Sequence, residues 1–559
     1  MIKCFRLLSR SPLVFTTLLA TTLFLLSADS TLAAETDLPV LATSYLGGAE
    51  NDQGNAIAVQ ADGTVVIAGR FSALPAAGTT RVLLGAAADA QGAILRFIDN
   101  GTTLASITRL GDSVDDMVLA PADDGIIAIG PFGLVKLSAD GSAVDWSQSG
   151  GDIARVDNSA IYSSGRRVDV AENGDIAILG NQSDGGNGFN GKIHLFDASG
   201  NPIETGSFVI PVEDIGGGTY SETWEDIAID SSRKLVFVTG KAQRCSAYQS
   251  SFLLAHSYAS ADFGRERWQS FTLWCSGADA ENLGADARGK RVVYQDDFLY
   301  FVGNADGGNN LFTRKAQDHT ISQTTANVQI DRWNNGAGFG SGALGYFAKM
   351  DPAVGTLVNG QFQFSSLGVN NARSFRINAL AVSSTGDVCI GGSSEKDMPL
   401  RDSLTLNGAA IGTRVDNENA LICVSGDFTA RNRVASWTGT SGAASSALTA
   451  IATRGGRTAV LGETEGDIVT TNAADGRKAA GTDVFFSVWG TANYPDGDFN
   501  CSTGIDIGDA VGVLKALSGT GEAPGTCLGA DGDFTGDGVW GIEDAIGLLQ
   551  VVAGARPSP

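Results

Sequence analysis

The sequence predicts an all-β protein whose main body is a seven-bladed β-propeller with four-stranded blades, followed by a small α-helical domain. Three observations predict this class. Residues 35–491 repeat one strand–turn–strand pattern, and no amphipathic helix of three turns interrupts them. Each repeat contains four short strands, which is typical of a propeller blade. Residues 494–553 contain a different, tandem repeat with a short apolar helix in each copy.

The N-terminal residues 1–34 have the features of a cleaved secretory signal peptide. Lys3, Arg6 and Arg10 precede an apolar run, and small residues at Ala33 and Ala34 offer a cleavage site. The apolar run is short for a transmembrane helix, and no later segment is longer. We therefore expect an exported protein with no membrane span, in three parts: 1–34 signal peptide, 35–491 propeller and 494–553 helical domain, with a tail at 554–559.

The formal net charge is −24, from 38 basic and 62 acidic residues. Such a chain repels nucleic acid, and no basic cluster offsets the repulsion. We expect no nucleic-acid partner.

The propeller repeat is marked by a glycine that ends the second strand of each unit. A typical hairpin is 56–69, in which Asp62-Gly63 forms the turn. A third apolar strand follows each hairpin, and most units add a fourth, more polar strand that suits the solvent-facing edge of a blade. The closing glycines are Gly69, Gly130, Gly180, Gly240, Gly303, Gly391 and Gly462.

The two ends of this body predict how the ring closes. The seventh unit stops after Trp489-Gly490 without a fourth strand, and residues 40–46 form a spare strand before the first unit. We predict that this spare strand completes the last blade and removes an open edge. A β-solenoid or a pair of sandwiches remains as an alternative, although spacings of 50 residues (Gly130 to Gly180) to 88 residues (Gly303 to Gly391) are long for solenoid turns.

Residues 45–59 resemble the bacterial β-propeller repeats of large exported proteins. The shared features are the Gly47-Gly48 pair, Asp52, and the strand Ile57-Ala58-Val59. The resemblance implies a propeller fold. It does not imply a particular chemistry, because this fold hosts many functions.

The C-terminal domain contains two copies of a twelve-residue loop. Asp496-Gly497-Asp498-Phe499 recurs 35 residues later as Asp531-Gly532-Asp533-Phe534 (531 − 496 = 35). Each loop places oxygen ligands at alternate positions, as calcium loops do. The second loop keeps Gly538 at the sixth position, so we expect it to bind Ca²⁺ more tightly than the first. The expected ligand and turn positions are Asp498, Asn500, Ser502, Gly504, Asp506 and Asp509 in the first loop, and Asp533, Thr535, Asp537, the Val539 carbonyl and Asp544 in the second.

Two calcium loops, each followed by a helix and closed by Asp, resemble a type I dockerin. The resemblance covers residues 494–553 and implies a cohesin-like protein partner. By that resemblance Ile507-Gly508 and Ile542-Glu543 begin the two recognition helices and face the partner. Packing of the isoleucines between the two helices is the alternative.

Six cysteines follow the signal peptide, and an even number in an exported chain suggests disulfides. Cys389 and Cys423 fall on the second and third strands of one unit, which are hairpin neighbours. Three pairs are candidates: Cys245–Cys275, Cys389–Cys423 and Cys501–Cys527.

The sequence contains no recognisable catalytic motif, and no catalytic residue is assigned. His194 lies between apolar strand neighbours and is expected to be a packed core histidine. Asp52, Asp115 and Asp226 precede first strands and are expected to accept hydrogen bonds from turn backbone. The loops 184–190, 304–310 and 331–345, the last of which contains Trp333, are the candidate ligand surface because amide and aromatic side chains suit sugars.

The favoured function is an exported, non-catalytic scaffold or binding protein. Its propeller would take an extracellular ligand, either a carbohydrate or a protein, and its C-terminal module would attach to a cohesin-like domain. The first alternative is a polysaccharide hydrolase or lyase built on the propeller. The second is a terminal module that only stabilises or sorts the chain.

Overall fold

The fold is known from a computed structural model. It describes residues 37–149 except 49, 167–183, 189–211, 222–244, 248–272, 285–322 except 308 and 310, 343–366, 372–437 except 397, 399–400, 402–403, 412–413 and 415, 446–490 except 475 and 477–480, and 510, 511, 514 and 542–553.

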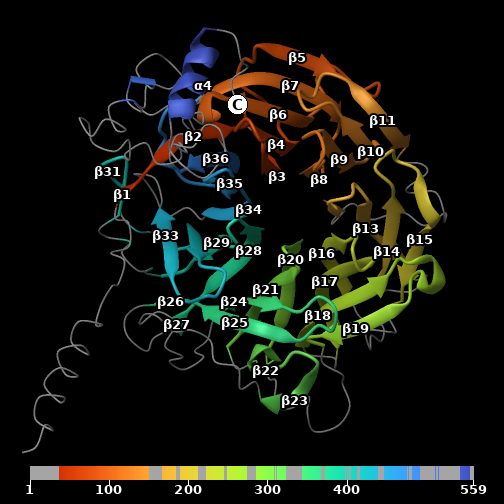
Figure 1. The fold of residues 1–559 in the computed structure, drawn as a ribbon. Coiled ribbons are helices and arrows are strands. Elements are labelled where there is room, and N and C mark those ends of the chain that lie inside the picture. Colours follow the sequence, from red (N-terminus) through yellow and green to blue (C-terminus); the bar gives the residue numbers. More distant parts are fainter. Residues whose placement is uncertain are drawn as a thin grey trace, which may run out of the picture.

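The described residues form seven radial sheets around one axis, and the first strand of each sheet lies innermost (Figure 1). The seven-bladed propeller is therefore confirmed. The strands are given from the innermost outward. Blade 1 contains β3 (Gln53–Val59), β4 (Val65–Arg70), β6 (Gly92–Ile98) and β7 (Thr103–Gly111), and blade 2 contains β8 (Asp116–Leu119), β9 (Ile126–Gly130), β10 (Gly133–Leu137) and β11 (Val144–Ser149). Blade 3 contains β12 (Arg167–Val170), β13 (Ile176–Ser183), β14 (Phe189–Phe196) and β15 (Pro202–Ile210), and blade 4 contains β16 (Glu222–Asp230), β17 (Leu235–Arg244), β18 (Tyr248–Ser257) and β19 (Glu266–Ser270).

The last three blades follow the same order, and the seventh takes its outer strand from the start of the chain. Blade 5 contains β20 (Ala287–Gln295), β21 (Phe298–Asp306), β24 (Ala343–Met350) and β25 (Leu357–Gln363). Blade 6 contains β28 (Phe375–Val382), β29 (Val388–Ser394), β32 (Glu418–Val424) and β33 (Arg431–Trp437). Blade 7 contains β34 (Ser446–Arg454), β35 (Arg457–Thr464), β36 (Asp483–Trp489) and β2 (Val40–Leu46).

Closure of the ring occurs as predicted. Strand β2 pairs antiparallel with β36, so that Tyr45 lies opposite Phe485. The Thr43 and Ser487 hydroxyls bond across this pair at 2.7 Å. The two ends of the propeller are thus held in one sheet, and β36 has no open edge.

Several short elements were not predicted from the sequence. Strand β5 (Thr79–Val82) adds a fifth strand to blade 1, parallel to β7. Strand β1 (Asp37–Leu38) pairs with β30 (Thr405–Leu406). The remaining short elements of this kind are β31 (Ala409–Ala410), β22 (Arg314–Lys315), β23 (Asp318–Ser322), β26 (Ser365–Ser366), β27 (Ala372–Arg373) and the 3₁₀ turns η1 (Asp99–Gly101), η3 (Ser260–Asp262) and η5 (Leu311–Thr313). The helix α4 (Ile542–Val552), in contrast, begins where the sequence predicts the helix of the second C-terminal copy.

Apolar side chains fill each of the seven gaps between neighbouring blades in the described ranges. Between blades 7 and 1, for example, the rings of Phe97 and Phe486 lie 4.5 Å apart, next to Leu461. The inner part of each blade is therefore buried on both faces, between its two neighbouring blades. This explains why these strands read as apolar runs and not as alternating patterns.

In blades 1 and 4 the repeated glycine of the second strand is required by close backbone approach. In blades 1 and 4 the inner strand shifts register beside this glycine, between Gly54 and Ala56 and between Trp224 and Asp226. A Cβ at Gly69 would overlap the carbonyl oxygen of Gln53, and a Cβ at Gly240 would overlap that of Thr223. Only glycine allows the second strand to lie this close to a bulged first strand.

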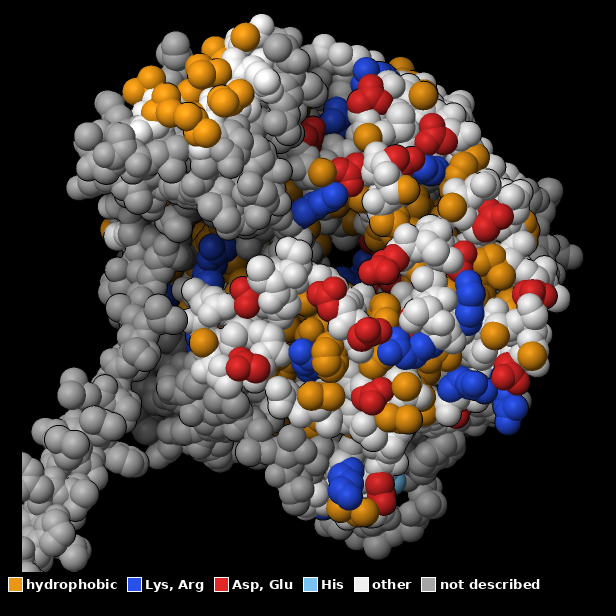
Figure 2. Space-filling model, in the orientation of Figure 1, with side chains coloured by type: hydrophobic (Ala, Val, Ile, Leu, Met, Phe, Trp, Pro, Cys, Tyr) orange, Lys and Arg blue, Asp and Glu red, His pale blue; other side chains and the backbone are white. Residues whose placement is uncertain are grey.

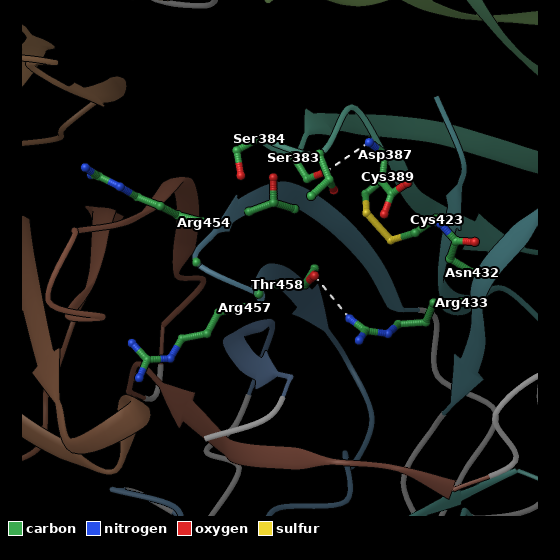
Figure 3. Close-up of a pocket in the computed structure, with 14 residues that line it drawn as sticks. Ser383, Ser384, Asp387, Cys389, Cys423, Asn432, Arg433, Arg454, Arg457 and Thr458 are labelled. Atoms are coloured by element: carbon green, nitrogen blue, oxygen red, sulfur yellow. Dashed lines mark hydrogen bonds between the residues drawn. A yellow bond between two sulfur atoms is a disulfide. The ribbon is translucent and has the colours of Figure 1, made fainter. Parts of the chain in front are cut away.

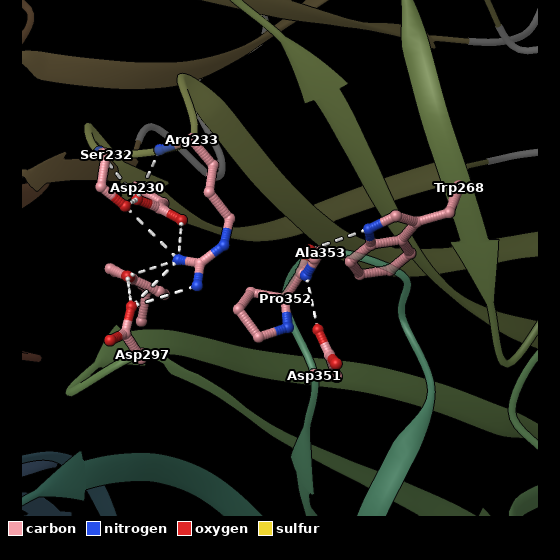
Figure 4. A network of polar contacts seen from close by, with 9 residues as sticks. Asp230, Ser232, Arg233, Trp268, Asp297, Asp351, Pro352 and Ala353 are labelled. Carbon is pink, nitrogen blue, oxygen red and sulfur yellow. Dashed lines mark hydrogen bonds and ion pairs between the residues drawn. The ribbon is translucent and has the colours of Figure 1, made fainter.

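Polar contacts between turns and strands also join neighbouring blades, as blades 4 and 5 show (Figure 4). The Arg233 guanidinium donates to Asp230 of its own blade at 2.8 Å and to Asp297 of the next blade at 3.1 Å. The Trp268 indole donates to the Pro352 carbonyl at 2.9 Å. Adjacent blades are thus tied by directed bonds in addition to apolar packing.

Cys389 and Cys423 form a disulfide between the paired strands β29 and β32, as predicted. The other four candidate cysteines, Cys245, Cys275, Cys501 and Cys527, lie outside the described residues. Among the helices that the structure describes, none has the length and apolar character needed to cross a bilayer.

Candidate functional site in the axial channel

The inner strands of all seven blades surround a cavity of about 180 Å³ on the propeller axis. Its lining comes from the middle of these strands and follows the whole ring, from Asn55 of blade 1 to Thr449 of blade 7. Figure 2 shows the molecule hollowed at this point, with Lys or Arg side chains visible in the hollow. The axial cavity is the candidate functional site.

Five charged residues line the cavity, and all come from blades 2–5. Their charges are mixed. The Arg167 guanidinium lies 3.7 Å from the Asp116 carboxylate and donates to the Glu225 carbonyl at 3.2 Å. The Arg291 guanidinium reaches past blade 6 to the Thr449 carbonyl of blade 7, at 3.5 Å. The five residues are Asp116, Arg167, Asp169, Asp226 and Arg291.

Each of the three aspartates also holds the next blade. The Asp116 carboxylate accepts from the Val168 backbone N–H at 3.0 Å. The Asp169 carboxylate accepts from Ile229 N–H at 2.9 Å, and the Asp226 carboxylate from Val292 N–H at 2.9 Å. One oxygen of each carboxylate is thus used for blade–blade bonding.

The other four junctions use neutral side chains for the same purpose. The Asn55 amide donates to the Val114 carbonyl at 2.7 Å, the Asn378 amide to Leu448 at 3.4 Å, and the Thr449 hydroxyl to Gly54 at 3.0 Å. Between blades 5 and 6, the Asn304 amide both donates to and accepts from the Ile377 backbone.

Burial in the channel shifts the titration of the charged residues. Desolvation raises the pKa of Asp169 to about 7, and the nearby Asp226 and Asp116 carboxylates add to the rise. Desolvation also raises the pKa of Asp226 to about 6, although Arg291 and Arg167 oppose this. The pKa of Asp116 is raised for the same reason. A carboxyl group with such a pKa holds a proton during part of the time at neutral pH, so it can both donate and accept hydrogen bonds.

The aspartates and the histidine chosen from the sequence have different roles. The Asp52 carboxylate accepts from the turn N–H groups of Gly48 and Ser72, which confirms that prediction. Asp115 accepts from the Ser113 hydroxyl at 2.6 Å. For Asp226 the turn role was wrong, because its partner is the next inner strand. His194 is buried as predicted, and desolvation lowers its pKa to about 4.

The candidate loops are only partly described. Within 304–310, Asn304 and Asp306 belong to β21, and Asn309 is buried. The Asn309 amide donates to the Ala285 carbonyl at 2.6 Å. These side chains therefore shape the backbone, and the prediction that they belong to a ligand surface is wrong for Asn304 and Asn309. Residues 184–188 and 331–342, including Trp333, lie outside the described residues.

The calcium loops also lie outside the described residues, apart from the backbone of Glu543 and Asp544 in α4. In the described ranges no group of three or more His, Cys, Asp or Glu side chains is placed to hold a metal ion. Ile542 is 60% exposed, and Ile546, Leu549 and Val552 are exposed on the same helix. They form part of the hydrophobic surface visible at the upper left of Figure 2.

Comparison with known proteins gives only distant structural similarity. No protein-family model matches the chain, and no curated protein matches it in sequence. The chain resembles the phage phi92 endosialidase with a TM-score of 0.34 and 10% identity, over 82% of this chain and 68% of that one. It resembles the Kuenenia stuttgartiensis hydrazine synthase with a TM-score of 0.31 and 12% identity, over 48% of this chain and 65% of that one, which is just under two thirds of its length.

The sequence contains a signal for the channel. The inner strands of blades 2–5 combine apolar residues with the charged residues Asp116, Arg167, Asp169, Asp226 and Arg291. Charged side chains within strands that are buried on both faces call for a shared polar space or for paired partners. The axial cavity provides that space.

Proposed function

We propose that the protein is an exported binding protein. Its propeller would hold a polar extracellular ligand in the axial channel, and its C-terminal module would attach it to a protein partner in a calcium-dependent way. The observation that supports the first part is a mixed-charge cavity enclosed by a closed ring of seven blades. A closed ring is rigid, and a preorganised site loses little conformational entropy on binding.

The chemistry of the cavity favours a polyhydroxylated ligand such as the end of a carbohydrate chain. Arg167 and Arg291 supply donors. The aspartate carboxylates supply acceptors in addition to their backbone bonds, because each oxygen can accept more than one hydrogen bond. Sugar hydroxyls both donate and accept, so they match such a mixed wall. The cavity of about 180 Å³ is smaller than the roughly 300–1,000 Å³ of typical ligand pockets, which suits one terminal sugar better than a long chain. A protein ligand that inserts one polar side chain is the other form of this proposal.

Binding can be tested with the full-length protein on a panel of immobilised polysaccharides. Arg291→Gln should weaken binding at least about tenfold, because a charge-assisted bond to a ligand contributes about 1.5–3 kcal/mol. Arg265→Gln is the matched control, since Arg265 is exposed and pairs with Asp262 three residues away. Equal binding by both variants and the wild type would exclude the channel as the site.

A second candidate function is a polysaccharide hydrolase or lyase. The supporting observation is that the pKa of Asp169 is raised to about 7 beside Asp226, whose pKa is raised to about 6. A general acid works best with a pKa near the working pH. The test is release of new reducing ends from the same polysaccharides. If release occurs and Asp169→Asn abolishes it, the enzyme proposal gains support, and absence of release from every substrate argues against it.

The attachment part of the proposal rests on the tandem loops and on the exposed apolar residues of α4. Ca²⁺ would neutralise the crowded carboxylates of each loop and allow the short helices to form. A fragment of residues 494–559 should gain helical circular dichroism on addition of calcium. Asp533→Ala should reduce this gain more than Asp498→Ala, and a signal independent of calcium would contradict the proposal.

The partner surface is tested by Ile507→Asp combined with Ile542→Asp. If both isoleucines contact a cohesin-like domain, the double variant should lose binding and keep its calcium-induced helicity. If the double variant no longer folds with calcium, these residues belong to the core of the module. That outcome would favour a module that only stabilises or sorts the chain.

A further inference from the structure

A second pocket, separate from the axial channel, lies between blades 6 and 7. It has a volume of about 170 Å³ and is bounded by the turn 383–387 of blade 6 and the turn 454–457 of blade 7 (Figure 3). Both turns join the first and second strands of their blades. No residue is shared with the lining of the channel.

The wall of this pocket is fixed by covalent and strand geometry. Cys389 and Cys423 line it, and their disulfide joins β29 to β32. Opposite them, Thr453 and Thr458 face each other across the β34–β35 pair. Ile451 and Val460 of the same two strands pack into the core between blades 6 and 7. Because side chains alternate along a strand, Thr453 and Thr458 point toward blade 6 as well.

The wall also contains an unsatisfied hydrogen-bonding group. The Thr453 hydroxyl is buried, and it has no hydrogen-bond partner among the described residues. A buried hydroxyl without a partner costs about 1–3 kcal/mol, so such groups in native proteins call for an explanation. A ligand that accepts from this hydroxyl would remove the cost.

Three arginines line the pocket: Arg433 lies in its wall, whereas the Arg454 and Arg457 guanidinium groups point away from its centre (Figure 3). The Arg433 guanidinium donates to the Thr458 hydroxyl at 3.1 Å, and both side chains are visible in Figure 3. The adjoining turn adds Arg454, which pairs with Asp124 at 2.6 Å, and Arg457. The lining thus contains three arginines and one acidic residue, Asp387, in a chain whose net charge is −24.

Arg457 is a buried cation with little compensation. Its side chain is 5% exposed, and its guanidinium donates to the neutral Asn100 amide oxygen at 2.6 Å. Its Nε has no partner in the part of the chain that the structure describes. The Asp62 carboxylate offsets part of the cost of this buried charge, and a further anion nearby would lower the rest.

We infer that the pocket between blades 6 and 7 binds a small oxyanion. Arg433 and the Thr453 and Thr458 hydroxyls would donate to it, and Arg457 would add its field from behind. The pocket is too small for a typical drug-sized ligand and is suited to a single anionic group. That group is either a free inorganic oxyanion or the carboxylate of an acidic sugar, because both present several acceptor oxygens to a guanidinium.

The inference is tested by calorimetric titration of the full-length protein with sodium sulfate and, separately, with sodium galacturonate, against sodium chloride at equal ionic strength. Saturable binding of sulfate alone identifies an inorganic oxyanion, and binding of galacturonate identifies an acidic sugar. Absence of saturable binding by both probes overturns the inference.

Two variants locate the site. Arg433→Gln should reduce affinity at least tenfold for the probe that binds. Thr453→Val is nearly isosteric and removes a hydroxyl with no described partner, so it should leave the melting temperature of the free protein unchanged or higher while reducing affinity several-fold. If affinity is unchanged in Thr453→Val and Arg433→Gln, the anion binds elsewhere and the inference is wrong.

The matched controls are distant from the pocket. Ser106→Ala also removes a buried hydroxyl without a described partner, but in the outer strand of blade 1. Arg265→Gln removes an exposed arginine of blade 4. Both should bind the probe as the wild type does. A loss of affinity in either control would show that the effect comes from general destabilisation or net charge, and would also overturn the assignment.

Discussion

The wall of the axial channel has two unlike arcs. Blades 2–5 contribute all five charged lining residues, whereas blades 6, 7 and 1 contribute small, apolar or neutral polar ones. In both arcs, polar side chains hydrogen-bond each blade to its neighbour near the axis. The charged arc does so with carboxylates that accept from backbone N–H groups, as Asp169 does from Ile229. The neutral arc uses amide and hydroxyl donors, as Thr449 does toward Gly54.

The difference matters because only one arc contains titratable bonds. Desolvation raises the pKa of Asp169 to about 7 and that of Asp226 to about 6, so the junctions of blades 3–5 respond to pH near neutrality, and it also raises the pKa of Asp116. The neutral arc contains ring closure by β2 and the Cys389–Cys423 disulfide. The two ends of the ring are thus held by strand pairing in blade 7, and a disulfide ties two strands of the neighbouring blade 6; neither depends on carboxylate protonation in this range.

The largest effect is expected from opening the neutral arc. Deletion of residues 36–48 removes β2 and leaves β36 with an exposed edge beside Phe485 and Trp489. An unpaired edge with apolar flanks aggregates, so the protein should aggregate or lose much of its thermal stability. Size-exclusion chromatography and thermal melting measure this. Removal of residues 1–35 is the control, and identical melting of the two deletions would disprove closure by β2.

A smaller loss is expected from removing the covalent bond in the same arc. Cys389→Ser with Cys423→Ala opens a loop with a sequence separation of 34 residues. Loop-closure entropy predicts destabilisation by about 3 kcal/mol. Denaturant unfolding gives the value, and the wild type in reducing buffer should unfold like the double variant. Peptide mapping that finds both thiols free in the exported protein would contradict the prediction.

In the charged arc the expected effect depends on pH. The pKa of Asp169 is about 7 in the folded protein, compared with an ordinary value of 3.8, so the folded state retains the proton over this interval. The free energy of unfolding of the wild type should therefore fall as pH rises from about 4 to 7. Asp169→Asn keeps an acceptor for Ile229 and cannot ionise, so it should be more stable than the wild type at pH 8, by on the order of 4 kcal/mol for a rise in pKa of about three units.

This comparison has a clear control in pH itself. At pH 3.5 the Asp169 carboxyl is protonated in the folded state and largely so in the unfolded state, so wild type and Asp169→Asn should differ little. A variant that is equally stabilised at pH 3.5 and pH 8 would show that the gain comes from packing, and that the carboxylate is not penalised by burial.

The smallest effect is expected in the neutral arc. Thr449→Val removes the hydrogen bond from the Thr449 hydroxyl to the Gly54 carbonyl and keeps the side-chain shape. The loss should be about 1 kcal/mol and the same at pH 5 and pH 8. Denaturant unfolding at both values checks this. A pH-dependent loss would mean that the two arcs are coupled through the contact of Arg291 with the Thr449 carbonyl.

Much of the propeller could be predicted from the sequence because its constraints are local. The closing glycines, such as Gly69 and Gly240, mark where the second strand meets a bulge in the first. The apolar third strands mark sheets that are buried on both faces. The pairing of Cys389 with Cys423 followed from placing them on adjacent strands of one hairpin.

Other features depend on contacts between residues that are distant in the chain. Strand β1 pairs with β30 across more than 360 positions, since Asp37 lies opposite Thr405. Two-residue strands have no periodicity, so no sequence pattern marks them. Asn304 was misread for a similar reason, because its partner Ile377 lies in the next blade.

The sequence by itself determined the number of blades, the strand that closes the ring, and the spacing of oxygen-bearing side chains in the two C-terminal repeats. Each of these features can be recognised from short sequence patterns of polar, apolar and glycine residues. Only the tertiary structure decided where the charges meet. Asp116, Arg167, Asp226 and Arg291 come from four different blades, and successive members lie at least 51 residues apart (167 − 116 = 51). They become neighbours because the ring brings every inner strand to one axis. The raised pKa values follow from that convergence, since desolvation and mutual repulsion depend on distance in space and not in sequence.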